Sequence, residues 1–245
     1  IGDAPADFQR LAPSFTVSLQ PWQEQLLFLR LMYKSTFRMP TFNDLYYYRL
    51  GNRSLRPEKA NEYNMGITWS RSFSSFLNYL SVTVDGYYND VTDKIVAFPT
   101  TYAWKMANYG KVHVTGMDAT LAAAASLGKN TVLVVSGGYT WQKAIDLTDA
   151  TSKSYKDQLP YTPKHSGNVS AVLEMPWVNV GYSIVGVSER YSMSQNIPEN
   201  RIDGYMEHTV SLSRNFSFRH CKLRLQAEII NLTDTQYDVI KYYPM

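Results

Sequence analysis

Apolar and polar residues alternate along most of the chain with a period of two residues, which is typical of β-strands. Residues 222–229 show it most clearly, because Leu223 and Leu225 alternate with Lys222 and Arg224. Helical periodicity is nearly absent. The alternation predicts ten strands, at 14–20, 25–35, 62–70, 80–88, 111–127, 131–143, 167–175, 178–184, 205–214 and 222–229.

Charged residues within these segments fall almost entirely on the face opposite the apolar one. The charges that follow this rule are Arg30, Lys34, Glu62, Asp85, Lys222, Arg224 and Glu228. Arg71 and Arg214 break it, and both lie at strand ends. A soluble β-sandwich with an apolar interior gives the same alternation, so the pattern alone does not separate a sandwich from a barrel.

The connections between the expected strands alternate between short and long. The short ones are 21–24, 71–76, 127–130, the turn at Pro176, and 215–220; the long ones are 36–59, 90–110, 144–166, 191–204 and 233 onward. Tight turns at one end and long loops at the other are typical of transmembrane β-barrels. Sandwiches mix their loop lengths at both ends. The loops therefore favour an all-β, antiparallel transmembrane barrel wall.

Aromatic residues follow the same geometry. Three tryptophans, Trp22, Trp69 and Trp177, lie at or beside the short turns. Near the expected long loops lie Tyr33, Tyr63, Tyr88, Tyr139 and Trp141. Two belts of amphipathic rings are expected at two membrane–water interfaces.

The composition excludes several other classes of protein. Lys and Arg number 24 against 21 Asp and Glu, and this excess of +3 is too small and scattered to predict nucleic-acid binding. One cysteine, Cys221, excludes an internal disulfide framework and a thiolate metal cluster. No stretch has the 18 or so apolar residues of a spanning helix. Residues 1–11 contain no secretory signal, and we expect the chain to be a mature fragment.

Two segments resemble the TonB-dependent outer-membrane receptors. Residues 33–67 are similar to that family's "FR-x-PT-x-x-(D/E)-LY" and "GN-x-x-L-x-PE" runs, and residues 223–245 resemble its penultimate strand, "NL-x-D-x-x-Y" turn and "YPMPGR" approach. The matching residues are Phe37, Arg38, Pro40, Thr41, Asp44, Leu45, Tyr46, Gly51, Asn52, Leu55, Pro57, Glu58, Asn231, Asp234 and Tyr237. The ending is closer to siderophore, heme and cobalamin receptors than to the glycan importers.

The resemblance implies that residues 1–245 are the C-terminal portion of a barrel of twenty-two strands, of which about ten are here. The family's plug domain, its TonB-contacting segment and the final strand are absent from the sequence, so we expect the remaining strands elsewhere in the same protein or on a second chain. The implied function is TonB-dependent import of an iron–siderophore, heme or corrinoid across the bacterial outer membrane. Implied partners are outer-membrane lipid, the plug, the TonB complex and a small nutrient; no nucleic acid is expected.

Candidate ligand contacts lie where aromatic rings and a cation occur together near the outer loops, since such groups suit a flat or anionic ligand. These candidates are Tyr46, Tyr47, Tyr48, Arg49, Tyr102 and Trp104. Tyrosines at such places also pack loops against each other or form the outer aromatic belt. Structural roles in shaping the loops are expected for Arg38, Pro40, Leu45, Asn52, Leu55, Pro57, Glu58, Asn231, Asp234 and Tyr237. The side chain of Asp234 is expected to bond the backbone of its turn.

No metal, cofactor or catalytic residue is expected. The four histidines are widely spaced, and no pair has a metal-ligand spacing on one strand face. One alternative is a self-contained ten-strand barrel acting as a hydrolase, which needs Asp44, Asp90, Asp93 and His113 to converge. A passive porin is the other alternative.

Overall fold

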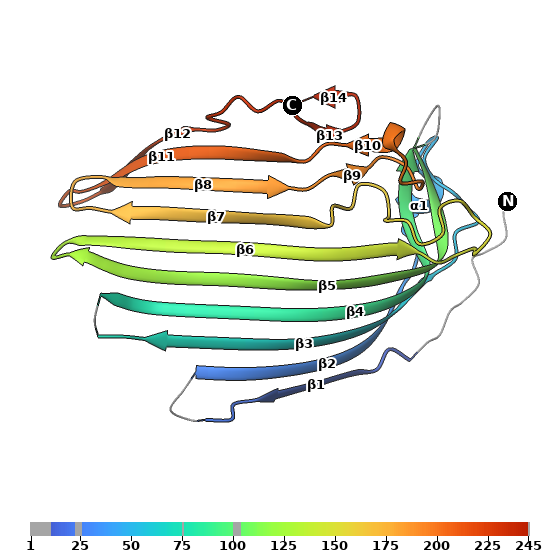
Figure 1. The fold of residues 1–245 in the computed structure, drawn as a ribbon, viewed down its shortest axis with the longest axis horizontal. Helices are drawn as coiled ribbons and strands as arrows, with labels where there is room; N and C mark the ends of the chain where they lie inside the picture. Colours follow the sequence, from blue (N-terminus) through green and yellow to red (C-terminus); the bar gives the residue numbers. More distant parts are fainter. Residues whose placement is uncertain (1–10, 23–25, 75, 100–103, 245) are drawn as a thin grey trace.

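Ten antiparallel strands form one sheet in which sequence neighbours are also neighbours in space (Figure 1). The structure is a computed structural model that describes residues 11–22, 26–74, 76–99 and 104–244. The order is β1 to β8, then β11 and β12, so β1 and β12 form the two edges and do not pair with each other. The expected ten-stranded antiparallel sheet is confirmed, and within the described residues it is an open wall.

Apart from β4 and β5, the strands of the sheet begin and end within a few residues of the expected bounds. The sheet contains β1 (Ser14–Leu19), β2 (Leu26–Arg38), β3 (Glu58–Ser72), β4 (Leu77–Pro99), β5 (Trp104–Gly128), β6 (Thr131–Asp146), β7 (His165–Glu174), β8 (Asn179–Val187), β11 (Tyr205–Ser217) and β12 (Lys222–Ile229). Outside it lie the pairs β9 (Arg190–Tyr191) with β10 (Arg201–Ile202) and β13 (Asp238–Ile240) with β14 (Tyr243–Pro244), the helix α1 (Phe42–Tyr46) and the 3₁₀ turn η1 (Pro198–Asn200). Among the described residues there is no helix with the length and apolarity to cross a membrane.

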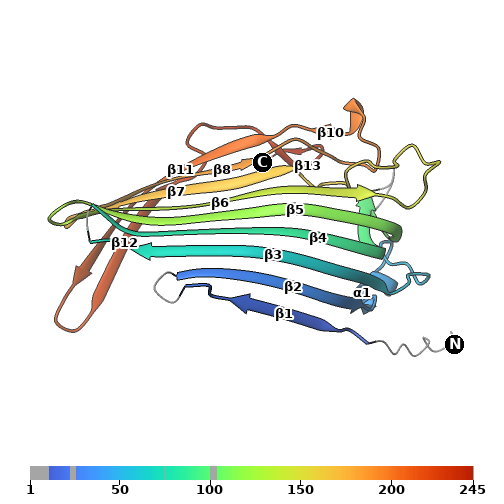
Figure 2. The same cartoon turned by 60° about the horizontal axis from the view of Figure 1, so that its bottom comes forward.

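Tight turns gather at one end of the wall and long connections at the other, on the left and right of Figure 1. Figure 2 shows that the wall is curved and that hairpin β11–β12 bends away at the short-turn end. The alternation of connection lengths therefore corresponds to two different ends of the sheet.

One expected loop is wrong. Residues 90–110 were expected to be a long connection, but β4 and β5 remain paired from Leu77 with Ala125 out to Pro99 with Trp104. Asp93 adopts the left-handed backbone region, with φ of 54°, and the ends of the hairpin turn across the long-loop end of the wall (Figure 1). At 23 and 25 residues these strands exceed the roughly 9–11 needed to cross a membrane. The excess projects beyond the apolar band, where alternation is no longer required.

The register keeps apolar residues on one face of the whole sheet. One row of directly paired residues runs through Leu29, Ile67, Val84, Ala119 and Tyr139. The adjacent row, on the opposite face, runs through Arg30, Gly66, Asp85, Asp118 and Thr140. Antiparallel pairing brings directly opposite side chains to the same face, so the two faces have distinct chemistry over every strand.

The apolar face is exposed and is not sealed between two layers. Met65 is 67% exposed, and Leu31, Leu121 and Leu225 are each at least 41% exposed. Buried apolar residues occur mainly where the long connections fold at the rim. A soluble sandwich with a dry interior is therefore excluded for the described part of the chain, and the apolar face is left to meet lipid.

Substituting arginine for Leu121 tests this assignment. Leu121 lies on the apolar face of β5, paired with Val82, near the middle of the band. We expect the membrane-inserted protein to lose about 2–4 kcal/mol of unfolding free energy, because a cation at the bilayer midplane is poorly solvated. Denaturant titration in lipid vesicles measures the loss.

The matched control is Thr120→Arg, one residue away on the polar face. It should cost far less, since that face meets polar groups and water. Equal losses from the two variants would contradict the assignment of lipid to the Leu121 face.

Candidate functional site

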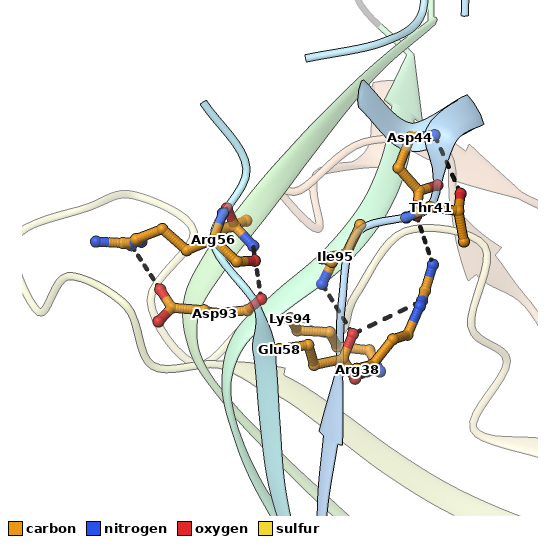
Figure 3. A network of polar contacts seen from close by, with 9 residues as sticks. Arg38, Thr41, Asp44, Arg56, Glu58, Asp93, Lys94 and Ile95 are labelled. Atoms are coloured by element: carbon orange, nitrogen blue, oxygen red, sulfur yellow. Dashed lines mark hydrogen bonds and ion pairs between the residues drawn. The ribbon is translucent and has the colours of Figure 1, made fainter. Parts of the chain in front are cut away.

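A network of charged side chains ties the connection after β2 to the wall (Figure 3). Arg38, the last residue of β2, places its Nη2 atom 3.0 Å from Oδ2 of Asp44 in α1. Its other terminal nitrogen lies 3.8 Å from Oε2 of Glu58, the first residue of β3. The two ends of the connection are therefore held by one guanidinium group.

Helix α1 forms at this point because its sequence supplies a complete capping box. The Thr41 side chain accepts a hydrogen bond from the Asp44 backbone N–H, and the Asp44 carboxylate accepts one from the Thr41 N–H at 2.9 Å. Burial raises the pKa of the Asp44 carboxyl, but the hydrogen bonds from Thr41 and the Arg38 guanidinium outweigh burial and hold the pKa below 3.8. Asp44 is therefore ionised under ordinary conditions and stabilises the turn.

The same network reaches the projecting end of hairpin β4–β5 (Figure 3). Glu58 accepts a hydrogen bond from the backbone N–H of Ile95 at 3.0 Å and lies 3.9 Å from the Lys94 ammonium. Arg56 pairs with Asp93, the residue at the bend, with 2.5 Å between Nη2 and Oδ1. These contacts fix the bend of the hairpin against the residues that precede β3.

A small apolar cluster completes this joint. Leu55, Ile95 and Met106 are buried together, with Leu45 and Leu50 packed against them. The Asn52 side chain donates to the Met106 carbonyl at 3.0 Å, and the Met106 N–H donates to the Leu50 carbonyl. Pro57 is buried as well, whereas Pro40 is partly exposed in the turn after β2. The structure thus places Leu45, Asn52, Leu55 and Pro57 in packing positions.

Two further long connections contact the same hairpin. The Tyr109 hydroxyl lies 2.6 Å from Oγ of Ser194, in the connection between β8 and β11. The rings of Trp104 and Tyr161 lie 5.7 Å apart, which joins the hairpin to the connection between β6 and β7. Hairpin β4–β5 is therefore the element on which the three neighbouring connections rest.

The aromatic candidates are displayed outward from this base. Tyr46, Tyr47 and Tyr48 are 47%, 59% and 78% exposed. The Arg49 guanidinium lies over the Tyr48 ring at 5.1 Å, and that of Arg53 lies over Tyr46 at 5.3 Å. We call Tyr46, Tyr47, Tyr48, Arg49 and Arg53 the aromatic knob. Trp104 is separate from the knob, in the contact with Tyr161, and Tyr102 lies outside the described residues.

Two lateral contacts on the polar face of the wall were not foreseen from the sequence. Arg30 of β2 and Asp85 of β4 pair at 2.9 Å across β3, directly over Gly66. A Cβ atom at Gly66 would stand 2.0 Å from the Asp85 carboxylate, so only glycine leaves room for this pair.

The second contact uses the same arrangement one row closer to the long connections. The Tyr87 ring lies over Gly116 of the neighbouring strand and its hydroxyl accepts a hydrogen bond from the Gln142 amide at 3.1 Å. Both contacts share one sequence feature that could have predicted them: a glycine on the polar face of a strand, with long polar side chains opposite it on the two neighbouring strands. Sequence reasoning cannot find that pattern without the register.

The family is identified by a match over nearly the whole chain. The family model described as "TonB dependent receptor-like, beta-barrel" matches residues 2–232. The chain belongs to this family. It therefore forms part of the wall of an outer-membrane receptor barrel, and its apolar face is the lipid-facing side while the polar face lines the lumen.

Two curated relatives of the chain are vitamin B12 transporters. The chain is 25% identical over 209 residues to the vitamin B12 transporter BtuB of Photobacterium profundum, covering 82% of this chain and 30% of the relative. It is 32% identical over 84 residues to BtuB of Vibrio vulnificus, covering 34% of this chain and 13% of that protein. The chain thus spans less than a third of the length of these curated relatives.

Two solved receptors share its fold. The ferric-catecholate import receptor Fiu from K12 E. coli superposes with a TM-score of 0.68 and 20% identity, over 95% of this chain and 33% of Fiu. The siderophore receptor PiuA from Acinetobacter baumannii also gives 0.68, with 19% identity over 94% of this chain and 32% of PiuA.

The second family motif of the receptor wall forms a compact turn after β12. Asn231 uses its side-chain oxygen and nitrogen to bond the N–H and the carbonyl of Thr235, at 2.8 and 3.1 Å. The Asp234 carboxylate instead accepts a hydrogen bond from the Gln236 side chain, so the backbone-bonding role expected of Asp234 belongs to Asn231. Tyr237 stacks on Tyr205 at 3.8 Å and donates to Glu207.

The carboxylates required by the hydrolase alternative do not converge. Asp90 lies 3.3 Å from His113 on the lipid-facing side, whereas Asp44 pairs with Arg38 and Asp93 with Arg56. In the described part of the receptor wall, no three histidine, cysteine or acidic side chains are grouped as metal ligands.

Asp44→Asn is expected to loosen residues 39–57 of the receptor without unfolding the wall. Loss of the charge weakens the hydrogen bonds from Thr41 and Arg38, and local opening should become easier by about 1–2 kcal/mol, since Arg38 is half exposed. Hydrogen exchange of this segment measures the effect. Asp203→Asn is the control, because Asp203 is an exposed partner of Arg201.

The same variant has a pH signature. The Asp44 pKa is lowered, so its stabilisation is complete above the ordinary value of 3.8 and disappears as the pH falls through the lowered value. The wild-type segment should lose protection in that acid range, and the asparagine variant should show no such loss. Identical acid profiles would contradict the role assigned to Asp44.

Proposed function

We propose that this chain is the C-terminal portion of the barrel of a TonB-dependent receptor that imports a scarce nutrient across the outer membrane. The plug, the remaining strands and the segment that contacts TonB would be supplied by the rest of the receptor. The observation that carries the proposal is the two-faced wall, with an apolar side for lipid, a polar lumen side, and exposed aromatic and cationic side chains at its long-loop end. An energised importer needs a receptor surface at that end.

The substrate classes named for similar proteins support the proposal. Two relatives are vitamin B12 transporters, and solved structures of the same fold include receptors for ferric catecholates and ferric citrate. We therefore propose an iron–siderophore, heme or corrinoid as the imported ligand. These are flat or anionic molecules, which suit stacked rings and guanidinium groups.

Within this proposal the aromatic knob captures the ligand. Its tyrosine rings are exposed while the residues at its base are buried, so the knob keeps its position without hiding its binding groups. Arg49 and Arg53 already lie against tyrosine rings, which orients their charge toward solvent next to apolar surface. Ligand contact at Trp104 and Tyr102 is part of the same proposal.

The test is uptake by cells that carry the complete receptor, with a panel of ferric catecholate, ferric citrate, heme and cyanocobalamin. Tyr48→Ala combined with Arg49→Gln should weaken binding of the imported ligand about tenfold, since a ring contact and a charge-assisted contact are both lost. Trp22→Ala, at the short-turn end, is the matched aromatic control and should bind normally.

Energy dependence separates the proposal from a passive porin. Collapse of the proton-motive force should stop uptake while leaving ligand binding intact. Uptake that continues without the gradient, or that tracks only the size of the solute, would overturn the proposal.

A further inference from the structure

Three lysines stand on the lipid-facing side of the wall near the long connections: Lys59 and Lys111 lie beyond the tyrosines of that face, and Lys143 lies level with them. Lys59 of β3 and Lys111 of β5 flank Thr92 of β4 on one row of the sheet. Adjacent strands lie about 4.8 Å apart, so the two lysines are about 10 Å apart at their Cα atoms. Lys143 of β6 lies on the row of Thr115 and Tyr88. All three side chains are exposed.

Tyrosine pairs mark the depth of this group. In each of the four hairpins that join at the long-loop end, a lipid-facing tyrosine bonds a polar residue on the next strand: Tyr33 with Asn61, Tyr88 with His113, Tyr139 with His165 and Tyr182 with His208, at 2.7 to 3.4 Å. Tyrosines on a lipid-facing surface lie at the level of the headgroups. Lys59 and Lys111 therefore stand at or just outside the headgroup layer.

The charge of this patch is positive. Between the tyrosine row and the long connections, Asp90 is the one carboxylate on the lipid-facing side of β2 to β6 in the described residues, and it lies 3.3 Å from His113. Ion pairs in the described ranges engage Lys94 and not Lys59, Lys111 or Lys143. Three ammonium groups are therefore left to bind an external anion.

An apolar groove lies further toward the middle of the lipid-facing band, past the row of Asp90 and the row of Tyr88. Gly86 interrupts a row of larger side chains between Met65 and Met117. Two hollows of about 460 and 540 Å³ meet there and share Leu31, Met65 and Gly86 in their linings. The groove continues toward the middle of the lipid-facing band along Ile67 and Val84.

We infer that this patch and groove bind one phosphorylated lipid of the outer leaflet. Its phosphate lies between Lys59 and Lys111. Lys143, four residues or about 13 Å nearer the middle of the band, extends its aliphatic stem toward the membrane side of the same headgroup. One acyl chain fills the groove at Gly86. From the row of Thr92 to that of Gly86 is six residues, or about 20 Å along the strand, a distance that the headgroup and an extended acyl chain together must span. The inference depends on the orientation of the wall in the membrane and not on the imported ligand.

The test measures lipid retained by the complete receptor in mild detergent, using native mass spectrometry with diphosphoryl lipid A as the probe. Phosphatidylethanolamine of matched chain length and inorganic phosphate are the comparison ligands. Wild-type receptor should retain the diphosphoryl lipid in preference to both. The variant with Lys59→Gln, Lys111→Gln and Lys143→Gln should bind it at least about tenfold more weakly.

The control removes the same number of charges elsewhere, with Lys34→Gln, Lys129→Gln and Lys153→Gln, on the lumen face, a short turn and a long connection. It should retain the lipid. A second variant, Gly86→Leu, fills the groove and should weaken binding while leaving the headgroup preference intact.

Several results would overturn the inference. Equal retention by the lysine variant and its control would remove the role of the patch. Equal binding of phosphatidylethanolamine, whose phosphate charge is balanced by its own ammonium group, would show no selectivity for an anionic headgroup, and competition by inorganic phosphate alone would indicate a site for the free ion. A dimer of the receptor that the lysine variant dissociates would assign the patch to a second copy. Ligand uptake is not measured, so these outcomes are independent of the proposed transport function.

Discussion

The backbone hydrogen-bond ladder, held in one continuous register across ten strands, is the constraint on which the rest of the structure depends. A membrane interior offers no water to satisfy a free N–H or carbonyl, so neighbouring strands must pair along the whole span. Pairing also fixes the faces, because a slip of one residue exchanges them. The row of Tyr33, Tyr63 and Tyr88 shows the result, with three strands presenting the same ring at the same level.

Glycine has opposite uses on the two faces of this ladder. On the lumen side, Gly66 and Gly116 let side chains from strands two positions apart meet, which ties the polar wall together laterally. On the lipid side, Gly86 has no such partner reaching across it and leaves a hollow. A missing side chain therefore becomes either a crossing point or a groove, according to the length and polarity of the residues on the neighbouring strands.

Alternation predicted the ten strands and the faces because lipid and lumen impose it on every spanning residue. Residues 90–110 escaped prediction because they project beyond that constraint, and a bend at Asp93 is compatible with a paired hairpin. The motif residues around Arg38 and Glu58 could be placed near each other, since they flank one connection. The contacts of Glu58 with Lys94 and Ile95 could not be predicted, because they depend on how hairpin β4–β5 bends. That Asn231 and not Asp234 bonds the backbone likewise follows from the conformation of the turn.

The projecting hairpin β4–β5 explains how the loops at this end can have fixed positions while their exposed residues are free to vary. Hairpin β4–β5 contacts the three connections through specific bonds, such as that from Asn52 to the Met106 carbonyl and that between Tyr109 and Ser194. The pair of Arg56 with Asp93 holds its bend. The tyrosines of the aromatic knob take no part in those contacts. Substitutions in the aromatic knob can therefore change which ligand is bound without disturbing the contacts that hold the connections in place. Hairpin β4–β5 is fixed by the same register that separates the lipid-facing side from the lumen side. The wall therefore sets the position of the binding surface, and the exposed residues of the aromatic knob set its chemistry.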